Sequence, residues 1–178
     1  MIQTERLLLR NWTGADIEPW LELNTEPVMR WLGGVRTREQ SVAAITDRFL
    51  PWQEQHGFTF WAVERKADAR LLGFCGLKFG DDPGSPVDGE YEIGWRLRED
   101  AWGQGYAREA ATASLDHAFR NIGAERVVAL TVEGNAPSWG LMERLGMTRR
   151  PDLDYEGPEW AQGVVIVYLI ERSQWLGT

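Results

Sequence analysis

The sequence is poor in cysteine, histidine and lysine. Its 178 residues include one cysteine, two histidines and two lysines, so that arginine supplies the other 17 of the 19 basic residues. A single cysteine, Cys75, cannot form an internal disulfide, which fits a reducing compartment. One cysteine with two histidines also gives no spacing typical of a zinc site. The sequence therefore predicts neither a disulfide nor a bound metal.

Long hydrophobic runs are also lacking. No stretch approaches the roughly 20 apolar residues of a membrane span, and the opening MIQTERLLLR has no apolar core of a signal peptide. The formal net charge is −8, whereas a protein that binds the phosphate backbone of nucleic acid, independently of sequence, needs a basic face. We therefore expect one cytoplasmic domain over residues 1–178, with no nucleic-acid and no membrane partner.

Tryptophan, in contrast, is abundant. The 10 tryptophans equal the 4 tyrosines and 6 phenylalanines together. Two explanations remain open: a coding bias that also favours arginine over lysine, or a need for large rigid aromatic faces in the core, a pocket or an interface.

Hydrophobic periodicity and turn residues divide the chain into alternating strands and helices. Thr13 and Thr37 begin capping boxes of two early helices. Strands are predicted over 4–10, 58–64, 71–79, 90–97, 127–132 and 164–170, later helices over 103–120 and 137–145, and a loop over 80–89. The strands over 58–64 and 71–79 form a predicted hairpin. This order indicates a mixed α/β or α+β sheet.

The segment Trp102-Gly-Gln-Gly-Tyr-Ala107 joins a strand to the longest helix. Two glycines permit close backbone approach, and the first N–H groups of a helix point outward and favour an anion. Such a turn suits a pyrophosphate. It is neither the dinucleotide fingerprint, because a third glycine is missing, nor an NTPase phosphate loop, because the sequence has no Gly-Lys-Ser/Thr.

Five motifs in order, TERLLLR, EIGW, WGQGYA, NAPS and ERLGM, resemble the GCN5-related N-acetyltransferase (GNAT) superfamily, and within it the ribosomal-protein N-terminal acetyltransferases. The resemblance extends from Thr4 to about Ile170. It implies a mixed, mostly antiparallel central sheet of about seven strands, splayed at the fourth strand and flanked by about four helices. It also implies acetyl-CoA as cosubstrate, with no metal.

The resemblance also assigns residues to coenzyme A. The pyrophosphate would lie on the backbone of Gly103, Gln104, Gly105, Tyr106 and Ala107, and the pantetheine arm on the backbone of Trp95 and Leu97 and on the side chain of Asn135. Gly94 suits the bulge at which the family splays this strand. Trp102 stands where the family usually has glutamine or arginine, so one side-chain contact is expected to be lost.

Two carboxylates and one hydroxyl are candidates for proton transfer. Glu92, the glutamate of the EIG motif, is the candidate general base, because burial beside a thioester would raise its pKa; a solvated strand-face carboxylate is the alternative. Glu90 lies on the same strand face and is the reserve candidate. The resemblance makes Ser138 the candidate acid for the leaving thiolate, because Met142 replaces the tyrosine that many family members use; Ser138 would either donate the proton directly or only order a water molecule.

The acceptor is expected to be a primary amine, either a protein N-terminus or a small molecule. In the family it is contacted by two segments, which here contain Trp31 and Trp160. Four acidic residues of the second segment suit a cationic amine: Asp152, Asp154, Glu156 and Glu159. The same run could also be a solvated loop. Alternative functions are a non-catalytic CoA-binding module and a transferase of longer acyl groups, and a homodimer is plausible by analogy.

Overall fold

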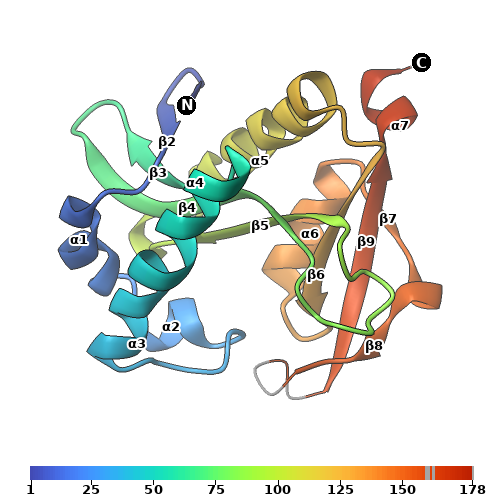
Figure 1. Ribbon diagram of the computed structural model, residues 1–178, viewed down its shortest axis with the longest axis horizontal. Coiled ribbons are helices and arrows are strands. Elements are labelled where there is room, and N and C mark those ends of the chain that lie inside the picture. Colours follow the sequence, from blue (N-terminus) through green and yellow to red (C-terminus); the bar gives the residue numbers. More distant parts are fainter. Residues whose placement is uncertain (159–160, 162, 178) are drawn as a thin grey trace.

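The computed structural model describes residues 1–158, 161 and 163–177. Figure 1 shows a twisted central sheet with helices on both of its faces. In the described residues the sheet has nine strands in the order β1-β2-β3-β4-β5-β6-β9-β7, with β8 also paired to β9. Their bounds are β1 Ile2–Gln3, β2 Leu7–Arg10, β3 Phe60–Arg65, β4 Arg70–Phe79, β5 Tyr91–Leu97, β6 Arg126–Val132, β7 Thr148–Arg149, β8 Tyr155–Glu156 and β9 Val164–Glu171.

The expected mixed, mostly antiparallel sheet is confirmed. All strand pairs are antiparallel except β5 with β6. The total exceeds the seven or so strands implied by the family resemblance. The sequence pattern itself located six strands, and the three that it missed, β1, β7 and β8, have only two residues each. Segments this short carry no alternation from which a sequence pattern could identify them.

The helices in the described residues are α1 Ile17–Leu21, α2 Glu26–Met29, α3 Arg38–Ala43, α4 Leu50–His56, α5 Tyr106–His117, α6 Ala136–Arg144 and α7 Arg172–Leu176. The capping box at Thr37 is present, because its hydroxyl accepts from the Gln40 N–H at 3.2 Å. A π-helical turn over Ala44–Phe49 joins α3 to α4. Pro51 then stands in the first turn of α4, where its missing N–H leaves no hydrogen bond unmade, so the helical path continues past it.

Three clusters of buried side chains cover the two faces of the sheet, and the smallest of them lies on β6 and β9. On one face α5 and α6 pack through Ala111, Leu115 and Leu141 against β2, β3, β4, β5, β6 and β9. On the other face α1 and the π-helical turn pack on β3 and β4, through an aromatic cluster that includes Trp20 and Phe74. Trp20 and Trp61 are 3% and 1% exposed, so both are core residues, as predicted.

The sheet is splayed at β5, the fourth predicted strand. Only Glu92 and Ile93 pair with β6, although β5 continues to Leu97 against β4. The predicted bulge at Gly94 is wrong for the β4–β5 pair, whose register passes through Gly94 without a shift. The glycine is needed for another reason: an added Cβ would lie 2.8 Å from Cζ of Phe60. No helix in the described part of the chain is long and apolar enough to cross a bilayer.

Candidate active site

The turn before α5 has the geometry of an anion cradle. Gly103 and Gly105 have φ values of +71° and +81°, a left-handed conformation that costs other residues about 1–2 kcal/mol. Gly105 is the N-cap of α5, and Glu109 is the residue whose N–H donates to the Gly105 carbonyl, at 3.0 Å. The N–H groups of Tyr106, Ala107 and Arg108 come before this first bond of the helix, so they have no acceptor within the helix.

Arg6 holds this turn in place, a contact that the sequence did not reveal. Its Nη1 donates to the Gln104 carbonyl at 2.9 Å, and its Nε lies 2.6 Å from Oε2 of Glu109. The guanidinium also lies over the ring of Tyr106, 4.5 Å from its centroid. Arg6 belongs to the TERLLLR motif and lies between β1 and β2, both of which contact α5. Because Glu109 compensates its charge, Arg6 positions the turn without adding net positive charge to the cradle.

The free edge of β5 presents the backbone groups that were predicted to hold the pantetheine arm. Successive residues of a strand direct their N–H and C=O groups to opposite edges. Gly80 donates to the Glu90 carbonyl and Arg98 donates to the Leu72 carbonyl, so the even-numbered residues of β5 face β4. The backbone groups of Trp95 and Leu97 therefore face the side of β6, where pairing has ended. The carbonyl of Leu97 accepts from Nε1 of Trp102 at 2.9 Å.

Glu92 is buried and ion-paired. It lies directly opposite Lys78 in the β4–β5 register, and Lys78 Nζ is 2.9 Å from its Oε2, with side-chain exposures of 9% and 13%. The solvated alternative is therefore wrong. Burial raises the pKa of Glu92 above its usual value, and the charge of Lys78 opposes that rise without cancelling it. A carboxylate in this state is suited to accept a proton near neutral pH.

Lys78 links Glu92 to two further charged groups. Its ammonium also pairs with Asp81, whose Oδ2 lies 2.9 Å from Nη2 of Arg48. Burial alone would raise the pKa of Asp81, but Lys78 and Arg48 outweigh burial and lower it. Arg48, Asp81, Lys78 and Glu92 thus form one chain of alternating charge, which we call the Glu92 chain.

Glu90, the reserve candidate, has a different environment. It precedes β5 and forms a two-bond ion pair with Arg126 at the start of β6, with Nε to Oε2 at 2.9 Å. This pair joins the two strands near the point where they are still in contact. The structure therefore gives Glu90 a structural partner and does not place it in the Glu92 chain.

The connection from β6 to α6 carries Asn135 and Ser138. Asn135 occupies the N-cap of α6, and its carbonyl accepts from the Ser138 N–H at 3.0 Å. Its side chain makes no capping bond; its Nδ2 donates instead to Oγ1 of Thr131 at 3.1 Å. Ser138 is partly buried in the first turn. Met142 is 1% exposed within the core, so the position that often carries tyrosine faces inward.

Trp31 lies in a cleft separate from the Glu92 chain. Its ring packs on Gly134, where an added Cβ would lie 2.8 Å from ring atoms. The cleft, of about 900 Å³, is lined by Trp31 and Trp139, by strand residues such as Tyr168, and by Glu143, Arg149 and Asp154, but not by Glu92. Trp160 lies outside the described residues, so its predicted place beside Trp31 stays a prediction.

The acidic segment before β9 is partly neutralised. Arg149 Nη1 donates to Oδ1 of Asp154 at 2.7 Å, and Arg150 Nη2 lies 2.6 Å from Oδ2 of Asp152. Two of the four predicted acceptor carboxylates are therefore already paired with arginine. Glu156 is exposed, and Glu159 lies outside the described residues. These contacts weaken the expectation that this segment attracts a cationic acceptor.

Other reactive groups do not form a site in the described residues. Cys75 is 0% exposed, and burial raises the pKa of its thiol to about 12, so it is a core residue. No three His, Cys, Asp or Glu side chains come together as metal ligands within residues 1–158, 161 and 163–177.

The chain matches the family model of the acetyltransferase (GNAT) domain over residues 6–148. It is 30% identical over 150 residues to the uncharacterized protein YkkB of Bacillus subtilis, covering 81% of this chain and 83% of that protein. It resembles the crystal structure of an acetyltransferase from Agrobacterium tumefaciens, at 27% identity and a TM-score of 0.79, covering 96% and 93% of the two chains. A putative ribosomal-protein-serine acetyltransferase from Vibrio cholerae shares the fold, at 20% identity and a TM-score of 0.78 over 96% of each chain.

Proposed function

The chain belongs to the GNAT acetyltransferase family, and from this premise we propose that it transfers an acetyl group from acetyl-CoA to a primary amine by direct attack. The observation that carries the proposal is the position of Glu92. A buried carboxylate with a raised pKa lies on β5, the strand whose free edge leads into the glycine cradle of α5.

The residues present fit coenzyme A. The left-handed turn at Gly103 and Gly105 and the first N–H groups of α5 suit a pyrophosphate, and Arg6 holds this turn in place. The free edge of β5 at Trp95 and Leu97 can receive an extended arm by strand addition. Bound acetyl-CoA supplies an activated acyl group on a thiol of pKa about 8.5, a tolerable leaving group near neutral pH.

The residues of this chain then have separate roles. Glu92 accepts the proton of the acceptor ammonium, directly or through water. The positive charge of Lys78 favours the ionised form of Glu92 inside the protein. A backbone N–H on the free edge of β5 polarises the acyl carbonyl. Asn135 orients the arm, and the Ser138 hydroxyl protonates the departing thiolate. Much of the rate acceleration comes from holding both reactants in one geometry.

A panel of acyl-CoAs and amines tests this function. The purified protein should release free CoA from acetyl-CoA only when an amine is present, and mass spectrometry should find the acetylated amine. Binding of acetyl-CoA, measured by calorimetry, without turnover of any amine would instead indicate a CoA-binding module. A preference for propionyl- or longer acyl-CoA over acetyl-CoA would indicate a transferase of longer acyl groups.

A substitution in the glycine cradle tests the cofactor site, and a glycine outside the cradle gives the matched control. Gly105→Ala should weaken acetyl-CoA binding, because the left-handed N-cap of α5 becomes strained and the new Cβ lies 3.3 Å from Nη2 of Arg6. Gly123→Ala has the same φ of +81° with nothing within 4 Å. It should lose similar stability without a change in acetyl-CoA affinity.

A further inference from the structure

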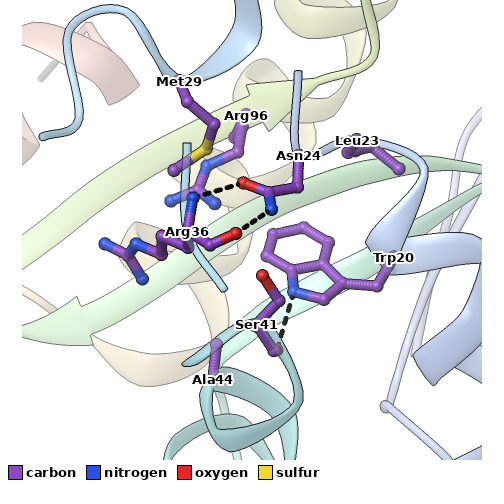
Figure 2. A pocket seen from close by; sticks show the side chains of 8 residues that line it. All are labelled: Trp20, Leu23, Asn24, Met29, Arg36, Ser41, Ala44 and Arg96. Carbon is purple, nitrogen blue, oxygen red and sulfur yellow. Dashed lines mark hydrogen bonds between the residues drawn. The ribbon is translucent and has the colours of Figure 1, made fainter. Parts of the chain in front are cut away.

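Arg96 is a partly buried cation that the proposed mechanism does not use. It lies on β5 opposite Phe74 of β4, in a small pocket between the sheet, α1, α2 and α3. Figure 2 shows this pocket, which we call the Arg96 pocket. Its lining residues are Trp20, Leu23, Asn24, Met29, Arg36, Ser41, Ala44 and Arg96.

The guanidinium of Arg96 has no anionic partner in the described part of the chain. Its Nε is buried without a hydrogen-bond partner, and none of the ion pairs found among residues 1–158, 161 and 163–177 includes it. The aromatic rings of Trp20 and Phe74 lie 5.1 and 5.3 Å from its central carbon. They offset part of the desolvation cost but accept no N–H bond in the plane of the guanidinium.

Other cations increase this deficit of negative charge. Burial, and then the charges of Arg36 and Arg48, lower the pKa of Arg96 to about 9. Arg36 lines the same pocket, and two hydrogen bonds between its backbone and the Asn24 side chain hold it there, one of them from the Arg36 N–H to Oδ1 at 2.9 Å (Figure 2). An arginine stays protonated in proteins, so a group that supplies negative charge here would be bound favourably.

The Arg96 pocket belongs to the same face of β5 as the candidate base. Glu92, Gly94 and Arg96 alternate onto one face, and at about 3.3 Å per residue the α-carbons of Glu92 and Arg96 lie about 13 Å apart. Arg48 connects the two places electrostatically, because its charge lowers the pKa of both Glu92 and Arg96. The Phe60 ring lies over Gly94 between the two places, so an acceptor that contacts both must extend past this ring.

We propose that the Arg96 pocket binds an anionic group of the acceptor, a carboxylate or a phosphate, while the acceptor's amine faces Glu92. This inference rests on the proposed acetyl transfer and names its substrate class: small amines that carry an acid. The pocket has about 10 Å³ of free space, close to the size of one water molecule. One oxygen of the anion enters to reach Arg96, and the rest stays near Arg36 at the mouth.

Matched pairs of amines test the proposal. Unbranched ω-amino acids of two to six carbons are compared with their amides, and phosphoethanolamine with ethanolamine, each with saturating acetyl-CoA. The wild-type protein should prefer the acid over its neutral counterpart by about 10- to 100-fold in kcat/KM, as expected for hydrogen bonds to a charged group. The two series distinguish a carboxylate from a phosphate acceptor.

Arg96→Gln should abolish this preference, and Arg36→Gln should reduce it. Arg36→Gln also keeps the test informative if the buried substitution prevents folding. Arg120→Gln is the control, because that side chain is 62% exposed on the chain after α5, and it should leave the preference unchanged. Acetyl transfer without any preference for acids, or a preference that survives in Arg96→Gln, would overturn the inference and leave the proposed function standing.

A binding measurement separates the two proposals if no amine is acetylated. With CoA occupying the glycine cradle, phosphate and acetate, each at matched ionic strength, should raise the Tm of the wild-type protein and not that of Arg96→Gln. A rise lost in the variant would support the anion site even though the proposed transfer had failed. Equal rises in both proteins, or none in either, would overturn the inference.

Discussion

Replacing Lys78 by methionine removes the cation that faces Glu92 across β4 and β5. The two charged atoms are 2.9 Å apart, so at an effective dielectric constant of about 20 their attraction is about 6 kcal/mol. Desolvation of both groups cancels part of this attraction. Removing one partner of a buried pair costs about 3–5 kcal/mol of stability, because the other charge is left unpaired.

The loss should depend on pH in a defined direction. Burial already raises the pKa of Glu92 in the folded protein, and Lys78 opposes that rise. Without Lys78, the pKa rises further above the unfolded value of about 4.3. A carboxyl whose pKa is higher in the folded than in the unfolded protein stabilises the fold below its unfolded pKa. This stabilisation is lost as the pH rises through the folded pKa. The stability lost in Lys78→Met should therefore be small near pH 4 and reach several kcal/mol by about pH 8.

Urea unfolding across this pH range measures the effect, with the free energy of unfolding obtained by linear extrapolation. Lys66→Met is the matched control, because Lys66 is the other lysine in the sequence and is exposed, donating to the Thr4 carbonyl. It should stay within about 0.5 kcal/mol of the wild type at every pH. A loss in Lys78→Met that is the same at all pH values would refute the buried ion pair.

Two further outcomes follow from the packing of the core. Gly94→Ala should cost about 1–3 kcal/mol of unfolding free energy, because its Cβ would lie 2.8 Å from the Phe60 ring, which is itself stacked on Phe74. Gly14→Ala is the control and should cost far less, because nothing lies within 4 Å of its added Cβ. Equal losses of stability in the two variants would contradict this packing. Cys75, with a thiol pKa of about 12, should not react with Ellman's reagent at pH 8 until the protein is unfolded in urea. Rapid labelling of the native protein would show that the thiol is accessible.

Most of the sheet could be predicted from local pattern. Alternation and turn residues located β3, β4 and the loop between β4 and β5, and the two glycines located the start of α5. These elements are long or are bounded by residues with strong backbone preferences, so the sequence is informative there. The last helix, α7, and the strands β1, β7 and β8 were missed because each is stabilised by tertiary contacts and not by a periodic pattern.

The environment of the candidate base could not be predicted in the same way. The EIG motif pointed to Glu92, but its partner Lys78 depends on the register of β4 and β5 across an eleven-residue loop. Register is set by packing of the whole sheet. Arg96 was overlooked for a related reason: its position in the strand is ordinary, and only the fold shows that aromatic rings, rather than carboxylates, surround it. Gly94 was identified as special, but the cause is the Phe60 ring and not a bulge.

The central claim is that Glu92 accepts the proton of the attacking amine. The measurement that tests it most directly is the pH dependence of kcat/KM for the wild type, Glu92→Gln and Glu90→Gln with one reactive amine. Glu92→Gln should lower kcat by about 10²- to 10⁴-fold and remove the rise in rate that reports ionisation of the base. Glu90→Gln, which alters only the pair with Arg126, should keep the wild-type profile. A Glu92→Gln enzyme with an unchanged pH profile and kcat would contradict the account.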